Sequence, residues 1–257
     1  MARGRAWTHD ELVIAMNLYC TMEFGQFHAR NRVIVEIAGK LDRSPSSLAM
    51  KLCNFASLDP YHAARGVRGL SGASQADRAV WDEFHRDWEG NAFESERLLA
   101  EIKGKRVEQE TEIDETDLPR EGKERERVVR QRVNQHFFRS TILAAYDRRC
   151  CVTGLANVEL LVASHIVPWA LNKVARVNPR NGLCLNALHD RAFDRGLMTI
   201  TKDFRVKLAP ELKTETVASS TQRWLAEFDD CPIRLPQRFL PDEQFLDWHR
   251  RQCFRAS

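Results

Sequence analysis

The polar residues between positions 160 and 200 are of types that could hydrolyse a phosphodiester bond. His165 ends an apolar run, Asn181 stands directly before a glycine, and His189 follows eight residues later. The reaction needs a base for the attacking water and a cation that stabilises the charge developing on the phosphate. A neutral imidazole suits the base because its ordinary pKa lies near the working pH. His165 is a candidate for such a base; the alternative is a satisfied core histidine in an aliphatic strand.

The side chains that follow this histidine could hold the cation. The amide of Asn181 could accept a hydrogen bond from the histidine or bind a metal through its oxygen, although Asn-Gly also marks turns. Asp190 and Asp194 are four residues apart, so a helix places both carboxylates on one face. Two hard oxygen ligands favour Mg²⁺ or Mn²⁺. His189 is a further candidate ligand.

The elements around these residues predict a strand, a loop, a second strand and a short helix. Residues 160–166 form an aliphatic run long enough for a buried strand, and residues 183–185 predict a second one. Residues 188–195 predict the helix. Beyond it, residues 197–201 and 205–208 alternate in polarity and predict a hairpin.

Strand, loop, strand and helix carrying His, Asn and then His-Asp resemble the HNH (ββα-metal) nucleases. The Ser-His-Ile-Val-Pro-Trp run from Ser164 and the Phe-Asp-Arg-Gly run that ends the helix are similar to one restriction-type subgroup. The resemblance implies that His165 is the general base and that Asn181 belongs to the catalytic site. The metal ligands that it implies are Asp190, His189, Asp194 and Asn181.

The sequence departs from the family pattern around the metal. These proteins usually place their last histidine nine residues after the middle Asn, where this chain has Asp190, with His189 one residue earlier. A register error of one residue would exchange the roles of these two. Ser164 stands where many members have an acidic ligand, which makes the helix carboxylates more necessary. For Asp194, a structural ion pair with Arg180 or Arg195 is the alternative.

The cysteines indicate a reducing compartment and no structural zinc. Their number is seven and they are scattered, which is typical of free thiols. Cys150 and Cys151 are adjacent and Cys184 stands alone, so the two Cys-x-x-Cys pairs of a zinc site are missing. We interpret Cys184 as a small buried strand residue.

The first hundred residues predict a helical domain that contains a helix-turn-helix. Thr8 with acidic residues behind it predicts a helix start. Residues 33–41 predict a second helix, and Ser44-Pro45 predicts the start of a third after a short turn. This arrangement is typical of DNA recognition, although helix pairs that merely pack are common. The residues expected to contact DNA are Arg43, Ser46, Ser47 and Lys51, with Arg180 and Arg191 in the second half.

The basic excess lies in the second half of the chain. The net charge is only +3, but residues 128–257 hold 20 Lys and Arg against 13 Asp and Glu. A phosphate-backbone partner would explain this excess; an ordinary solvated surface is the alternative. Residues 101–127 are highly charged with few apolar side chains, so we expect a linker that is partly disordered or partly helical.

Together these patterns predict an α+β protein in three parts. Residues 1–100 form a helical, helix-turn-helix-like DNA-recognition domain, residues 101–127 a charged linker, and residues 128–257 a ββα-metal (HNH) nuclease domain. We expect a metal-dependent endonuclease of restriction or defence type that acts on double-stranded DNA, with a homodimer left open. No membrane span or signal core is visible, which predicts the cytoplasm. The alternative is a DNA- or partner-binding protein whose nuclease centre has decayed.

Overall fold

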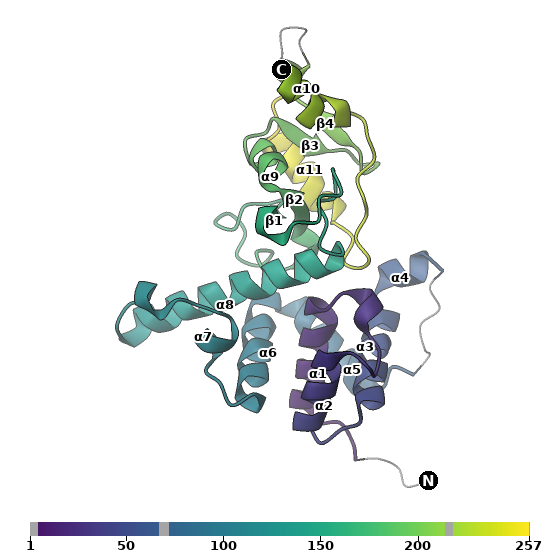
Figure 1. Ribbon diagram of the computed structural model, residues 1–257, viewed down its shortest axis with the longest axis vertical. Helices are drawn as coiled ribbons and strands as arrows, with labels where there is room; N and C mark the ends of the chain where they lie inside the picture. The colour runs from purple at the N-terminus through teal and green to yellow at the C-terminus, as the bar shows by residue number, and fades with distance from the viewer. Residues whose placement is uncertain (1–4, 67–71, 214–217, 257) are drawn as a thin grey trace. The chain divides into compact units, whose positions relative to one another are not determined.

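The chain forms two compact units in the computed structural model, which describes residues 5–66, 72–213 and 218–256 (Figure 1). Unit 1 comprises Met1–Ala144 and unit 2 comprises Ala145–Ser257. The predicted mixture of helix and sheet is confirmed, because the described residues hold two small two-stranded sheets among many helices. The two units meet within the last turn of a long helix, and the predicted boundaries after residues 100 and 127 stay predictions.

Unit 1 is built around α1 (His9–Thr21), in which every residue from Glu11 to Cys20 is buried. Thr8 caps this helix as predicted: its hydroxyl accepts from the Glu11 N–H, and the Glu11 carboxylate accepts from the Thr8 N–H. Around α1 pack α3 (Pro45–Leu58), α5 (Gln75–Arg86) and α6 (Trp88–Ile102). A helix that is apolar on nearly all sides lies at the centre of a core.

The predicted helix pair is confirmed as α2 (Arg32–Lys40) followed by α3. Asn31 caps α2, and Ser44 caps α3 with proline at its first position. The turn between them contains Asp42 with a φ of 52°, a left-handed conformation that Asp tolerates better than most residues. The short α4 (Pro60–Ala64) follows α3.

The segment predicted as a charged linker, partly disordered or partly helical, is partly helical in the structure. It contains α7 (Val107–Glu110) and the start of α8 (Gly122–Ala145). Leu118 is buried in a small apolar cluster with Val129 and Val133 of α8. The partly buried residues that pack against this cluster are Phe93, Val107, Ile113 and Val128. A few apolar side chains therefore fold the segment onto its neighbouring helices, a contribution that composition alone underestimates.

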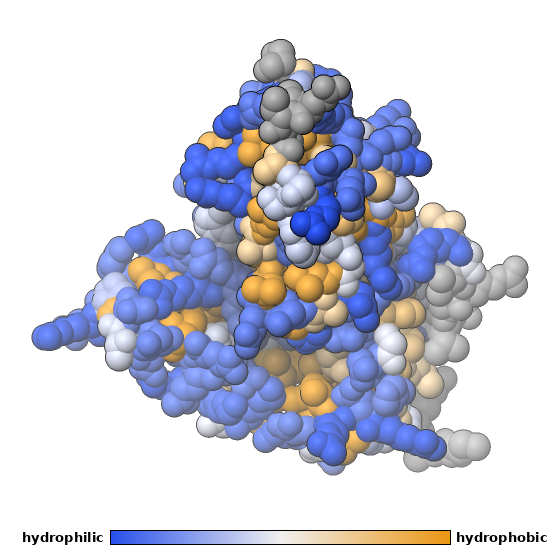
Figure 2. Space-filling model, turned by 45° about the horizontal axis from the view of Figure 1, so that its top comes forward, coloured by the Kyte–Doolittle hydropathy of each residue, from blue (hydrophilic) through white to orange (hydrophobic). Residues whose placement is uncertain are grey.

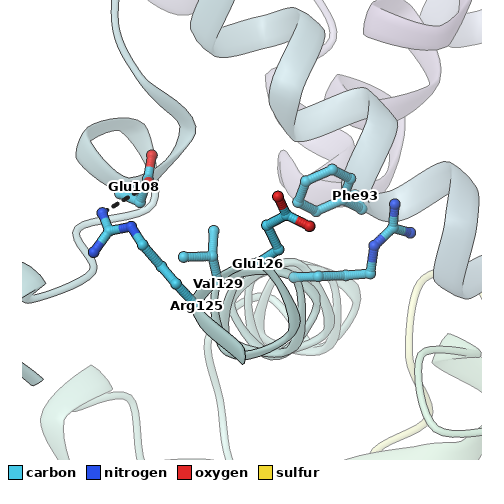
Figure 3. Close-up of a pocket in the computed structure, with 6 residues that line it drawn as sticks. Phe93, Glu108, Arg125, Glu126 and Val129 are labelled. Carbon is cyan, nitrogen blue, oxygen red and sulfur yellow. Dashed lines mark hydrogen bonds and ion pairs between the residues drawn. The ribbon is translucent and has the colours of Figure 1, made fainter. Parts of the chain in front are cut away.

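A pocket of about 320 Å³ lies among α6, α7 and α8 (Figure 3). Its lining consists of Phe93, Glu108, Arg125, Glu126, Val129 and Arg130. An ion pair of 3.3 Å joins Arg125 to Glu108 at one side. The lining contains no residue of the sequence-predicted site.

Unit 2 contains the predicted strand, strand and helix. β1 (Leu161–His165) pairs antiparallel with β2 (Gly182–Asn186), with His165 opposite Gly182. α9 (Ala187–Asp194) follows directly and packs on both strands. The predicted hairpin is confirmed as β3 (Met198–Ile200) paired with β4 (Val206–Leu208). α9 also packs on β3, so the helix lies between the two sheets.

The C-terminal α11 (Glu243–Gln252) packs on β3 and supports the end of α9. The His249 ring stacks on Phe193 with centroids 3.7 Å apart, and its Nε2–H donates to the Phe193 carbonyl at 3.1 Å. Gly196, with a φ of 70°, follows α9 where the chain end approaches closely. A Cβ there would lie 1.9 Å from the Cys253 carbonyl oxygen, so this position requires glycine.

The remaining elements are short. They are α10 (Ser219–Trp224) and the 3₁₀ turns η1 (Phe24–Gln26), η2 (Glu115–Asp117), η3 (Val158–Leu160), η4 (Pro179–Asn181), η5 (Pro210–Leu212) and η6 (Ala226–Phe228). Hydrophilic side chains cover most of the face seen in Figure 2, and apolar ones occupy smaller areas. Among the helices that the structure describes, none is both long and apolar enough to cross a bilayer.

Candidate active site

His165 lies half-buried at the end of β1, and the hydrogen bond of its ring indicates which ring nitrogen carries the proton. Its Nε2 is 2.8 Å from the backbone carbonyl oxygen of Arg176. Because a carbonyl can only accept, the proton is assigned to Nε2 and the lone pair to Nδ1. Burial lowers the pKa of the ring, and the Arg176 hydrogen bond opposes this only in part. The ring is therefore neutral near pH 7, as a general base requires.

Asn181 is fully buried beside the end of β1. Its Oδ1 accepts from the Val167 N–H at 2.8 Å, and its Nδ2 donates to the carbonyls of Val167 and Ala175 at 3.0 and 3.2 Å. Its backbone carbonyl accepts from the Ile166 N–H at 3.0 Å. The side chain therefore holds together the two ends of the loop between β1 and β2. This geometry gives it a positioning role, and its predicted roles in catalysis and metal binding stay predictions.

Ser164, Asp190 and Asp194 are brought together by the packing of α9 on β1. Burial raises the pKa of Asp190, and the neighbouring Ser164 hydroxyl lowers it in part. The pKa of Asp194 is raised by burial and by the negative charge of Asp190. The two carboxylates therefore share one face of α9, as the spacing predicts. A cation between them would relieve their repulsion.

His189 faces the opposite way, into the core of unit 2. Its Nδ1 is 3.0 Å from Asn186 Oδ1, which also accepts from the His189 N–H at 2.9 Å and so caps α9. The edge of its ring packs against Phe228 at 5.4 Å. Burial lowers the pKa of His189 to about 4. This burial favours Asp190 over His189 as the metal ligand.

The donor set fits a Mg²⁺ or Mn²⁺ site that substrate phosphate completes, and it does not fit a site made of protein side chains alone. Within the described ranges, no group of three or more His, Cys, Asp or Glu side chains is placed to hold a metal. Mg²⁺ commonly takes one or two carboxylates and completes its shell with waters and substrate phosphate oxygens. Asp190 and Asp194, with Ser164 beside them, fit a Mg²⁺ or Mn²⁺ ion held jointly with a bound phosphate. The prediction that Cys184 is a buried strand residue is confirmed.

Two of the residues predicted to contact DNA, Arg43 and Lys51, form ion pairs within unit 1 instead. The Arg43 side chain is only 8% exposed and forms an ion pair with Glu11 at 2.7 Å. Lys51, 13% exposed, pairs with the fully buried Asp77 at 2.8 Å. Both cations also lie beside the ring of Trp7. The expectation that they face DNA is therefore corrected: each neutralises a buried carboxylate, which would be costly to leave unpaired.

The other residues predicted to contact DNA remain near the surface. Ser46 is exposed and Ser47 half-buried at the start of α3. Arg191 is exposed on α9. Arg180 is exposed too, but its guanidinium pairs with Asp242 at 3.2 Å. This ion pair takes the place of the one considered between Arg180 and Asp194.

Some contributors to the site carry no signal in the sequence. Arg176 and Ala175 act through backbone carbonyls, which every residue has. Ser164, which its place before His165 already marks in the sequence, contributes through its position opposite α9, which depends on how the helix packs on the strand. Only the folded loop identifies the two carbonyls.

The comparison with protein families agrees with this geometry. Residues 150–201 match the HNH endonuclease family. This segment contains β1, β2, α9 and β3, and with them every group described above around His165 and Asp190. This segment is similar to the HNH endonucleases, and the similarity indicates nuclease activity. No curated protein matches the chain.

Proposed function

We propose that this protein is a metal-dependent endonuclease of restriction or defence type that hydrolyses phosphodiester bonds in double-stranded DNA. The observation that carries the proposal is the neutral His165 ring at the end of β1. The Arg176 carbonyl holds its proton on Nε2 at 2.8 Å and so directs a basic Nδ1 away from that bond. This arrangement lies in the segment that matches the HNH endonucleases.

In this mechanism His165 removes a proton from the attacking water through Nδ1. The hydrogen bond to the Arg176 carbonyl keeps the ring oriented and stabilises the imidazolium that forms. Asn181 keeps the loop that carries this carbonyl in place. Asp190 and Asp194 would hold the divalent cation, which when bound stabilises the charge developing on the phosphate.

The selection of DNA is the second part of the proposal. The α2–α3 pair of unit 1 has the form of a helix-turn-helix, and Ser46 is exposed at the start of its second helix. The N-terminal residues of such a helix are those that contact DNA in this motif. On α9 of unit 2, the exposed Arg191 supplies a cation close to the carboxylates. Arg43 and Lys51 are not part of this proposal.

A plasmid-nicking assay with Mg²⁺ or Mn²⁺ tests the proposed activity. We expect His165→Ala to lower the single-turnover rate by about 10²-fold or more, the scale of general-base catalysis, with DNA binding retained. His28→Ala is the matched control, because His28 is an exposed histidine of unit 1. Wild-type cutting by His165→Ala would refute the assignment of the base. A wild-type protein that binds DNA and cuts none with either metal would favour the alternative, a DNA-binding protein whose nuclease centre has decayed.

A further inference from the structure

The loop between β1 and β2 carries the two most exposed large aliphatic side chains among the residues that the structure describes. Val174 is 82% exposed and Leu171 is 67% exposed. Single exposed apolar side chains are common and need no function. These two, however, lie three residues apart in one loop, and that loop connects His165 to Asn181 (Figure 1).

Hydrogen bonds hold the loop backbone so that both side chains stay outside. Asn172 Oδ1 accepts from the N–H groups of Val174 and Ala175 at 3.1 and 3.0 Å. The Leu171 N–H donates to the loop backbone at 3.0 Å. The base of the loop is closed by Asn181. These bonds fix the loop backbone in the conformation that leaves Leu171 and Val174 exposed.

The loop that carries the two side chains is basic in sequence. Residues 166–180 contain Lys173, Arg176 and Arg180 and no Asp or Glu, and of these cations Arg180 is paired with Asp242. Lys173 is exposed and lies between Leu171 and Val174 in sequence. An apolar tip within a segment of purely positive charge suits a partner that has anionic edges and an apolar interior.

The loop is also joined directly to the proposed base. Arg176 provides the carbonyl that accepts from His165, and its guanidinium lies 5.1 Å from the centre of the Trp169 ring. That ring packs edge-to-face against the His165 ring at 5.5 Å. Contacts of Trp169 and Arg176 therefore connect this loop to the proposed catalytic histidine.

We propose that Leu171 and Val174 form a wedge that enters the minor groove of duplex DNA and separates two neighbouring base pairs. This inference rests on the proposed nuclease function and adds how the duplex is presented to it. Apolar side chains inserted at a base step unstack it in part and kink the duplex, and adjacent cations contact the flanking phosphates. Lys173 and Arg176 would make those contacts. The kink would turn a phosphate of the same step toward His165.

The test uses the full chain and a duplex that contains 2-aminopurine, whose fluorescence rises when it is unstacked. Binding is measured without divalent metal, and cleavage of the intact duplex is measured with Mg²⁺. We expect wild-type protein to raise the fluorescence and Leu171→Ala to lose most of that rise. Leu171→Ala should also cut the intact duplex roughly tenfold more slowly, because the apolar contact of the wedge is lost. A duplex with mismatched, already unstacked base pairs should be cut at the wild-type rate.

Two variants separate the wedge from other effects. Leu160→Ala is the matched control, since Leu160 is 50% exposed in the same unit and lies outside the loop; it should behave as wild type. Leu171→Lys adds a cation and removes the apolar tip, so it should bind at least as tightly and still fail to unstack the base. Unstacking by Leu171→Lys at the wild-type level would overturn the proposal.

The outcomes distinguish the wedge from the nuclease activity. Cutting by wild type together with unchanged fluorescence and rate in Leu171→Ala overturns the wedge and leaves the proposed function standing. Unstacking by a wild-type protein that cuts no DNA supports the wedge and refutes the proposed function. A protein that binds no duplex refutes both.

Discussion

Substitution of Asn181 separates a positioning role from the metal-ligand role that the sequence predicts. The side chain is fully buried and makes three hydrogen bonds, of 2.8, 3.0 and 3.2 Å, to the backbone of the loop. A buried hydrogen bond contributes about 1 kcal/mol net. Asn181→Ala should therefore lower the free energy of unfolding of unit 2 by about 3 kcal/mol, and more where the buried Val167 N–H stays unpaired. It should also slow cutting, because the carbonyl that orients His165 lies on this loop.

For Asn181→Asp, the positioning role and the metal-ligand role predict opposite results. A carboxylate at this position lacks both N–H donors and places negative charge against the carbonyl oxygens of Val167 and Ala175. If Asn181 holds the loop, the variant should be at least as unstable as Asn181→Ala, since an unpaired buried charge is costly. If Asn181 is a metal ligand, the added carboxylate should strengthen Mg²⁺ binding.

Urea unfolding followed by circular dichroism gives the stability, and a Mg²⁺ titration of plasmid cutting gives the metal requirement. Asn157→Ala is the control, because Asn157 is an exposed asparagine of the same unit. We expect both Asn181 variants to unfold at lower urea with an unchanged Mg²⁺ concentration at half-maximal rate. Wild-type stability in Asn181→Ala, or a lower Mg²⁺ requirement in stable Asn181→Asp, would refute the positioning role.

Three further predictions concern charge and burial. The pKa values of His189 and His249 are lowered by burial to about 4, below the ordinary 6.5, so unfolding takes up protons between these values. Their contribution to stability is full above pH 6.5 and is lost as the pH falls toward 4, by up to about 3 kcal/mol each; a flat urea midpoint from pH 7.5 to 5 would contradict this. Asp190→Asn and Asp194→Asn should each raise the Mg²⁺ needed for half-maximal cutting, whereas a loss of thermal stability alone would assign Asp194 to structure. Arg43→Ala should cost about 2 kcal/mol, because the Glu11 carboxylate loses its buried partner and keeps only the more exposed Arg5, and gel shifts should show unchanged affinity for DNA.

Local sequence patterns were sufficient for most of the secondary structure. The caps at Thr8 and Ser44, the strands on either side of Asn181 and the helix that carries Asp190 are indicated by patterns of residues close in sequence. The match of residues 150–201 to the HNH endonucleases agrees with the family that these spacings resemble. The burial of His189 is also implicit in the sequence, because it shares a helical face with the inward Ala192 and Phe193. Because its spacing from Asn181 also made His189 a candidate metal ligand, the sequence left open whether the side chain is buried.

The tertiary structure decided which polar groups face each other. Arg43 was a plausible DNA contact by its position before α3, but Glu11, 32 residues earlier, accepts its hydrogen bonds. Asn181 reaches Val167 across 14 residues of loop, and the carbonyl that orients His165 comes from Arg176, 11 residues away. Such partners depend on which distant parts of the chain pack together, and any residue type can supply a backbone carbonyl. The sequence therefore determined the elements and the candidate base, and the packing of loop, strand and helix determined what each polar side chain contacts.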